Sequence, residues 1–198
     1  NTLPRPEQES DKEIALHGVS FVEVRQANGQ WRYEQNSPFN ARLTPNTPIA
    51  LSGPAAGNAL MKTKVDVSGK RARGTLNNCG TGKTPWNTLL TGEENWAGYF
   101  FRSANDDAAR NDQSVVALNR YGRKQGEASR HGWESAGTDD KYVRWNNSKI
   151  GSSADGSDDY RNEMNTFGYI VEVDPYNPTR MVKKRTGLGR FAHESAAY

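Results

Sequence analysis

Short runs that alternate apolar and polar residues recur along this 198-residue chain, and turn residues separate them. This pattern predicts a protein built from short β-strands. Residues 18–25 form the first run, and the Asn-Gly pair at 28–29, the strongest short hairpin signal, follows it. Residues 31–33 then begin the returning strand. Residues 167–174 form a second clear strand, and residues 182–186 are its expected return partner.

The other segments carry weaker signals. Residues 1–16 mix proline and charge and are predicted to form an extended arm, which leaves residues 17–198 as one domain. Residues 62–67 and 71–76 are predicted to form short strands, and residues 104–110 are the best helix candidate. Short strands at regular spacing with turn signals are typical of an all-β meander, sandwich or propeller.

Composition limits the class of protein. Hydrophobic residues make up 34% of the chain and the mean hydropathy is −0.91, yet 5 Trp, 8 Tyr and 6 Phe can fill a core between short strands. The net charge of +3 comes from interspersed residues, and no basic run with interleaved aromatics indicates a nucleic-acid partner. No stretch approaches the roughly 20 apolar residues of a membrane span. The single cysteine excludes an internal disulfide.

That cysteine, Cys79, is the most informative chemical group. A lone cysteine is most often a small buried hydrophobe, but Cys79 stands in the polar run 77–82 with few apolar neighbours. A thiolate in such surroundings acts as a nucleophile or as a soft metal ligand. A nucleophile needs a base, and the three histidines, His17, His131 and His193, lie in no recognisable cysteine-hydrolase signature. Metal ligation is therefore the favoured function.

Three carboxylates could share a cation with Cys79. Glu172 lies within an otherwise apolar strand, where a carboxylate is costly to bury unless it is paired or bound to a cation. Only one of the adjacent Glu93 and Glu94 can face the same site as Cys79, because successive strand residues point to opposite faces. Glu194 is the third candidate. Carboxylates with a thiolate suit iron or another transition ion, and carboxylate and amide oxygens suit calcium.

A phosphate-binding loop is a different interpretation of the same region. The sequence Gly82-Lys83-Thr84 matches the end of that motif, but the first glycine of the motif is replaced by Asn77. Pro85 also falls where the helix after the loop should continue, and proline there removes a helical hydrogen bond. We therefore reject a nucleotide-binding loop.

Several short motifs follow one another from about residue 17 to residue 195. They are His17-Gly18-Val19-Ser20, Ser52-Gly53-Pro54-Ala55-Ala56-Gly57, Asn77-Asn78-Cys79, Thr84-Pro85-Trp86, Thr91-Gly92-Glu93-Glu94-Asn95, Phe167-Gly168-Tyr169-Ile170-Val171-Glu172-Val173-Asp174-Pro175 and Gly189-Arg190-Phe191-Ala192-His193-Glu194. In this order and approximate spacing they resemble the signature of the PhoX-type alkaline phosphatases. Several matches in order are far more specific than any one of them.

The resemblance implies a β-propeller, with its blades joined by long loops and short helices, that hydrolyses small phosphomonoesters. It implies export to the periplasm or outside the cell by the twin-arginine route, and a site with two ferric ions and with calcium. On the matching positions, Cys79 would be an iron ligand and Glu172 an iron or calcium ligand. Glu94 and Glu194 would be calcium-side ligands, with Asn78 a further candidate. The implied reaction is metal-assisted in-line attack on phosphorus.

Arg190 is the candidate residue for binding phosphate, and a surface ion pair is its other possible role. The chain departs from the family pattern at three positions, with Asn87 and Ser195 where glycine is usual and Gly92 where cysteine is frequent. Family members are several times larger, so the resemblance covers only the N-terminal portion of such an enzyme. We therefore expect an incomplete chain that is inactive alone, with the C-terminal part of the same enzyme as its partner.

Two other functions fit the residues. One is a non-catalytic extracellular β-domain that uses polar loops such as residues 146–159 to bind calcium or carbohydrate. The other is a phosphodiesterase or lactonase-like propeller. Iron content separates the first from the phosphatase, because a calcium-binding module has no reason to hold iron through a thiolate. A substrate profile separates the second.

Overall fold

An open six-stranded sheet forms the centre of the computed structural model, which describes residues 3–177 and 179–198. The order across the sheet is β6-β5-β10-β9-β8-β7. Its strands are β5 (Pro48–Ser52), β6 (Arg71–Arg73), β7 (Asn78–Lys83), β8 (Leu89–Glu93), β9 (Ile170–Val173) and β10 (Lys183–Arg185). Two smaller pairs are β1 (Val19–Phe21) with β4 (Ala41–Leu43), and β2 (Val24–Ala27) with β3 (Gln30–Tyr33).

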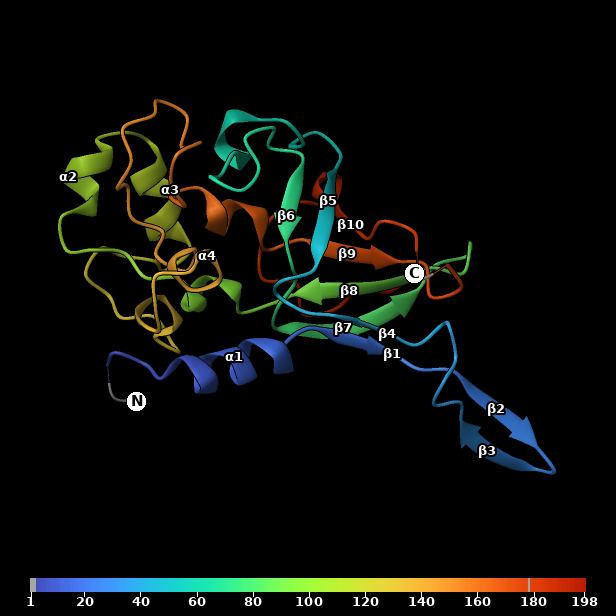
Figure 1. The fold of residues 1–198 in the computed structure, drawn as a ribbon. Coiled ribbons are helices and arrows are strands. Elements are labelled where there is room, and N and C mark those ends of the chain that lie inside the picture. Colours follow the sequence, from blue (N-terminus) through green and yellow to red (C-terminus); the bar gives the residue numbers. More distant parts are fainter. Residues whose placement is uncertain (1–2, 178) are drawn as a thin grey trace.

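The helices are short and gather at the end of the molecule away from the β2–β3 hairpin (Figure 1). They are α1 (Glu7–Leu16), α2 (Asp106–Arg110), α3 (Ser114–Arg120) and α4 (Asp140–Val143), with 3-10 turns η1 (Ala59–Met61), η2 (Trp96–Tyr99), η3 (Trp133–Ser135), η4 (Glu163–Thr166) and η5 (Thr186–Leu188). The chain is thus mainly β-sheet with a few helices, which agrees with the sequence-based expectation at that level. Within the described residues, no helix is both long and apolar enough to cross a lipid bilayer.

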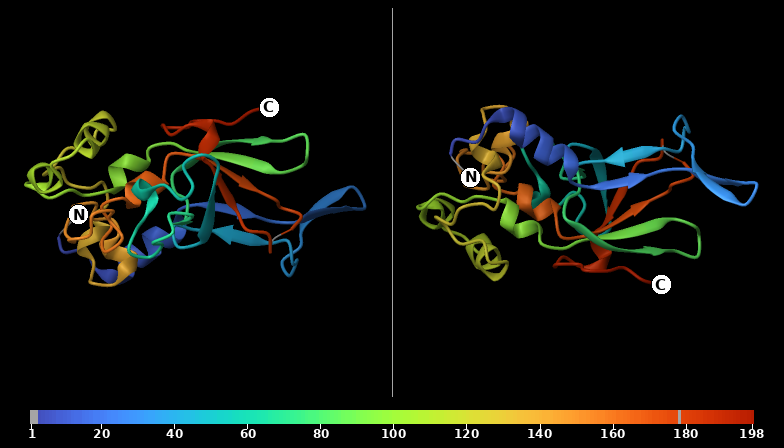
Figure 2. Two further views of the ribbon diagram at one scale, coloured as in Figure 1. Left: turned by 90° about the horizontal axis from the view of Figure 1, so that it is seen from above. Right: turned by 90° about the horizontal axis from the view of Figure 1, so that it is seen from below.

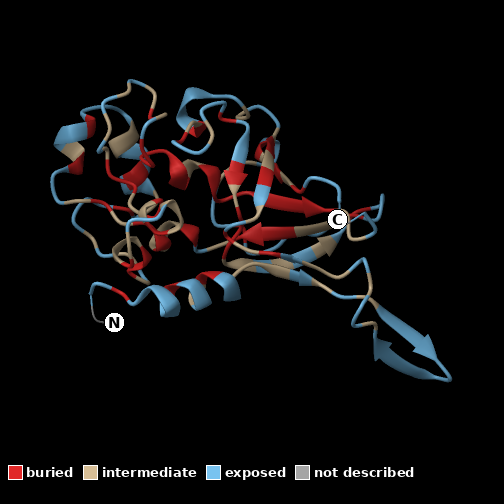
Figure 3. Ribbon diagram, in the orientation of Figure 1, coloured by how far each residue is buried: buried red, intermediate tan, exposed pale blue. Residues whose placement is uncertain are grey.

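The predictions for β9 and β10 are confirmed. Strand β9 lies between β8 and β10 and is antiparallel to both, with Glu172 opposite Leu90 on one side and Lys183 on the other. Strand β10 also pairs in parallel with β5, at Lys184 and Leu51. All four residues of β9 are buried, because both its edges and both its faces are covered (Figure 3).

The hairpin predicted from the Asn-Gly pair is also confirmed. Asn28 and Gly29 have φ angles of 52° and 76°, the positive values that a tight hairpin turn requires. Every residue of β2 and β3 is exposed, and the hairpin projects from the body of the molecule (Figures 1 and 3).

The extended arm predicted for residues 1–16 is wrong where residues 7–16 form α1; residues 1–2 lie outside the described part. Pro6 directly precedes the helix, where its missing N–H costs nothing. Glu7 and Glu9 lie in the first turn, where the helix dipole favours negative charge. The helix buries Ser10 and Ile14, and this tertiary contact fixes a segment with little apolar periodicity.

The strand predicted for residues 62–67 is wrong as well. The segment is a turn in which the backbone N–H of Thr63 donates to the carbonyl of Asp66. The Asp66 carboxylate accepts hydrogen bonds from the backbone N–H groups of Lys70 and Arg71. Aspartate competes with strand pairing in this way because its short side chain satisfies nearby backbone donors.

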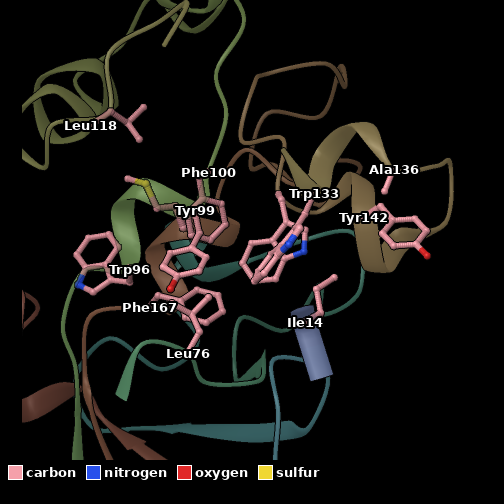
Figure 4. Close-up of a cluster of buried hydrophobic side chains, with 12 residues drawn as sticks. Ile14, Leu76, Trp96, Tyr99, Phe100, Leu118, Trp133, Ala136, Tyr142 and Phe167 are labelled. Carbon is pink, nitrogen blue, oxygen red and sulfur yellow. The ribbon is translucent and has the colours of Figure 1, made fainter. Parts of the chain in front are cut away.

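Aromatic side chains make most of the core at the helical end. Figure 4 shows a cluster in which α1, η2, η3 and η4 all contribute. The indole rings of Trp133 and Trp145 lie 5.0 Å apart in an edge-on arrangement, and the Phe100 ring lies 5.6 Å from that of Phe167. Burying large rings stabilises a fold that has few aliphatic residues.

Candidate functional site

A face made of three glycines lies on β7 and β8, and the segment 193–197 runs across it. A Cβ atom added at Gly80, Gly82 or Gly92 would lie 2.7, 1.8 or 2.4 Å from a carbonyl oxygen of that segment. Glycine is therefore required here for close backbone approach. Figure 2 shows the C-terminal segment beside β7 and β8 in both views. The close approach of the 193–197 segment explains why position 92 on β8 is a glycine.

Two backbone hydrogen bonds fix the segment on this glycine face. The N–H of His193 donates to the carbonyl of Glu93 at 3.0 Å, and the N–H of Gly80 donates to the carbonyl of Glu194 at 2.6 Å. The N–H of Glu94 donates to the carbonyl of Asn77 at 3.1 Å, which joins the end of β8 to the start of β7. Three stretches that are distant in sequence meet at this point.

Cys79 lies where these stretches meet, and its thiol is exposed. A hydrogen bond to the Glu94 carboxylate is the main cause that raises the pKa of the thiol, followed by burial; the negative charges of Glu94 and Glu194 act in the same direction. The structure thus brings the backbones of three predicted ligands, Cys79, Glu94 and Glu194, to one place through the hydrogen bonds of Gly80 and Glu94.

Asn78 precedes Cys79 on β7, and its amide lies on the side of Thr75 and Glu93. Its Nδ2 donates to the Thr75 hydroxyl at 2.8 Å, while its Oδ1 is buried and has no hydrogen-bond partner within the described chain. An unpaired buried carbonyl oxygen is costly, and a cation or a water molecule would satisfy it. Across the described residues, no three His, Cys, Asp or Glu side chains are placed to hold one metal ion, so these groups alone make no complete coordination shell.

The adjacent Glu93 has a structural role. Its side chain is fully buried and forms an ion pair with the equally buried Lys184, with Oε1 and Nζ 2.8 Å apart. Glu93 also accepts hydrogen bonds from the Thr75 hydroxyl and from the backbone N–H groups of Gly168 and Tyr169. This carboxylate therefore ties β8 to β9 directly beside the candidate ligand Glu94.

Glu172 lies elsewhere on the sheet, in a small hollow of about 120 Å³. Its carboxylate accepts hydrogen bonds from Trp86 Nε1 at 2.9 Å and from the Thr88 hydroxyl at 2.7 Å, and it pairs with Arg185. Burial opposes ionisation, but these three donors outweigh it and lower the pKa of Glu172 to about 2. The expectation that this buried acid needs a partner is met by Arg185, so in this structure Glu172 does not join Cys79.

The Arg190 side chain already forms hydrogen bonds and aromatic contacts within the chain. Its Nε and Nη2 donate to the carbonyls of Phe167 and Met164 at 2.9 and 2.8 Å. The guanidinium also lies 4.3 Å from the Trp96 ring centroid and 4.4 Å from that of Tyr121. Burial lowers the pKa of Arg190. The side chain borders a larger cleft of about 530 Å³ between η4 and α3, and no carboxylate pairs with it in the described part of the chain.

One further polar group supports the start of β7, and the motif at residues 17–20 did not show which residues its histidine would contact. The Tyr99 hydroxyl lies 3.0 Å from Nε2 of His17 and 3.4 Å from Oδ1 of Asn77. Nδ1 of His17 donates to the carbonyl of Glu13 at 2.7 Å. Asn77 has a positive φ of 48°, so this chain of polar contacts fixes an unusual backbone conformation just before Asn78.

We expect Gly82→Val to displace segment 193–197 from the glycine face, because the new Cβ would lie 1.8 Å from the carbonyl oxygen of Ala196. The two backbone hydrogen bonds at Gly80 and His193 should weaken, each by about 1 kcal/mol. Hydrogen exchange of these two amides should then be roughly fivefold faster.

The matched control is Gly187→Ala, because a Cβ at Gly187 would meet only a Pro54 side-chain atom, at 3.7 Å. Exchange at Gly80 and His193 should stay unchanged in this variant. Equal protection of both amides in Gly82→Val and in the parent protein would show that the segment does not depend on the glycine face.

Comparison with known proteins gives three findings. A family model described as alkaline phosphatase PhoX matches residues 2–198. Among solved structures, the chain is similar to Pseudomonas fluorescens PhoX in complex with vanadate, a transition state analogue, with 39% sequence identity and a TM-score of 0.78. The similarity covers 98% of this chain and 30% of that chain, so this chain spans less than a third of its solved relative. No curated protein matches it.

Proposed function

The chain belongs to the PhoX alkaline phosphatase family, and on this basis we propose that it is part of an enzyme that hydrolyses phosphomonoesters with calcium and iron as cofactors. The observation that carries the proposal is the family match over residues 2–198. The relative of known structure binds vanadate, a transition state analogue, which supports phosphoryl transfer as the reaction of the complete protein.

The residues at the start of β7 fit a mixed cation site. The exposed Cys79 lies where the backbones of Glu94 and Glu194 also meet, and Asn78 has a buried oxygen without a hydrogen-bond partner among the described residues. We propose that Cys79 holds iron and that Glu94, Glu194 and Asn78 hold calcium, in line with the preference of soft sulfur for transition ions and of hard oxygen for calcium. Bound cations would neutralise the charge of the phosphoryl oxygens during in-line attack.

The protein's own residues shape this site in two ways. The glycine face positions the backbone of Glu194 beside the strand that contains Cys79. The buried ion pair of Glu93 and Lys184 fixes the end of β8, which Glu94 directly follows. For Glu172 the proposal is narrower. It serves as a metal ligand only when the Arg185 guanidinium moves away, because in this structure three donors already occupy its oxygens.

The same proposal covers architecture and location. We propose that the six-stranded sheet contributes to a β-propeller that other parts of a longer polypeptide complete. The 30% coverage of the solved relative supports this interpretation. Location in the periplasm or outside the cell rests on family membership alone.

We expect the isolated 198-residue chain to turn over p-nitrophenyl phosphate at background rate, because no complete metal shell is present among its described residues. The complete protein with calcium and iron should be active and should lose activity when a chelator removes the metals. Steady-state assays of both proteins at alkaline pH measure this. Robust turnover by the isolated chain would contradict its partial status, and an inactive complete protein would contradict the phosphatase proposal.

A calcium- or carbohydrate-binding module is not favoured by the polar loop at residues 146–159. Asp158 already accepts hydrogen bonds from the backbone N–H groups of Ser152 and Ser153. Asp159 accepts from the backbone of Ile150 and pairs with Arg161. These internal donors explain why the loop is rich in Asp and Ser.

A further inference from the structure

A hollow of about 210 Å³ lies beside the candidate ligand Glu94. Its wall is formed by η2 on one side and by the residue before His193 on the other, and its lining includes Glu94, Trp96, Gly98, Tyr121, Arg130 and Ala192. The hollow therefore shares one lining residue, Glu94, with the candidate ligands. Its volume exceeds that of several water molecules, so a phosphate group can enter it.

Arg130 supplies the positive charge in this hollow. Its guanidinium forms no ion pair with a carboxylate in residues 3–177 and 179–198, although it shares the hollow with Glu94. The buried arginines Arg102, Arg110 and Arg144, in contrast, each pair with an aspartate or a glutamate. Arg130 is exposed, so an anion from solution can reach it.

The backbone of Arg130 is held in place, and its guanidinium lies near an aromatic ring. The backbone N–H of Arg130 donates to the carbonyl of Gly98 at 2.7 Å, and its guanidinium lies 5.2 Å from the centroid of the Tyr99 ring. Gly98 leaves room for this arrangement, because a Cβ there would lie 3.2 Å from Nη2 of Arg130. A cation that is held by a ring and a backbone needs little further ordering when it binds a ligand.

We infer that Arg130 binds the phosphate group of the substrate in this hollow, next to the proposed cation ligand Glu94. The inference rests on the proposed phosphatase function. An arginine fork presents parallel N–H donors that match two phosphate oxygens, and such charge-assisted pairs are strong. The other arginine near the site, Arg190, has already given two of its nitrogens to backbone carbonyls. Arg130 therefore has the donors that a phosphate dianion needs.

The test compares Arg130→Gln and Arg130→Lys in the complete metal-loaded protein, with Arg32→Gln as the matched control. Arg32 is exposed on the β2–β3 hairpin, which projects away from this region (Figure 1). In Arg130→Gln, the KM for p-nitrophenyl phosphate and the Ki for inorganic phosphate should rise roughly 10- to 100-fold, the loss expected for a hydrogen bond to a charged group. Arg130→Lys should recover part of this, and Arg32→Gln should match the parent protein.

Equilibrium binding of inorganic phosphate, measured by calorimetry, gives a readout that does not depend on turnover. A Kd raised roughly tenfold or more in Arg130→Gln supports the inference. KM, Ki and Kd within twofold of the Arg32→Gln values would overturn it while leaving the phosphatase function intact. Absence of turnover in the parent protein would instead overturn the proposed function, and phosphate binding would still decide the role of Arg130. If Arg130→Gln does not fold, Arg130→Lys decides by the same comparison.

Discussion

Replacing Cys79 by serine in the complete protein is expected to remove iron and, with it, most of the phosphatase activity. Sulfur is a far better ligand than a hydroxyl for iron, and serine does not ionise near neutral pH. We expect iron affinity to fall about a hundredfold or more. Loss of a residue that only hydrogen-bonds to a metal ligand costs about 10- to 100-fold, so the loss of a direct ligand should exceed this. Elemental analysis of the purified variant measures the iron content directly.

Folding should be unaffected by Cys79→Ser, because the thiol is exposed and the substitution leaves no cavity. The matched control is Thr81→Ala, an exposed change two residues further along β7. Iron content and melting temperature should equal those of the parent protein in this control. Unchanged iron in Cys79→Ser would show that the cysteine is structural only, and the assignment of iron to this position would then be wrong.

The second large effect is expected for Lys184→Met, which should destabilise the protein by about 3 to 5 kcal/mol. Lys184 and Glu93 are both fully buried, with Nζ and Oε1 2.8 Å apart, and Nζ also donates to the carbonyl of Thr166. Removing the ammonium group leaves the Glu93 carboxylate buried without its counter-charge. Urea unfolding of the complete protein measures the change in free energy.

Lys183→Met is the control, because Lys183 is the neighbour of Lys184 on β10 but is only half-buried and forms no ion pair in the described chain. Its effect should stay within about 0.5 kcal/mol. The double variant Lys184→Met with Glu93→Gln should recover part of the stability, because no unpaired charge then remains. Equal stability of Lys184→Met and Lys183→Met would refute the role of the buried pair.

Local signals predicted the parts of the fold in which neighbouring residues decide the structure. The Asn-Gly turn at 28–29 gave the hairpin, and the apolar run at 170–173 gave the central strand. Helix α1 was missed because its stability comes from burying Ile14 against an aromatic core made of distant residues. Strand β5 was missed because its pairing with β10 is parallel and joins residues that are far apart in sequence.

In the candidate site too, some features follow from neighbouring residues and others depend on contacts between distant parts of the chain. Strand alternation predicted different roles for Glu93 and Glu94, and the structure buries Glu93 in an ion pair with Lys184. The order of the motifs suggested that Glu194 belongs with them, but only the three-dimensional glycine face shows how it arrives there. Arg130 gave no signal, because its importance depends on the lack of an ion-pair partner in the folded chain.

The projecting β2–β3 hairpin has a practical consequence. Every residue of both strands is exposed, and nothing lies within 4 Å of a Cβ added at Gly29. Exposed loop tips of this kind accept inserted sequence with little thermodynamic cost. The tip at 28–29 is therefore a suitable place to introduce a fluorescent reporter or an affinity epitope, away from the candidate site and without any change to the packed interior.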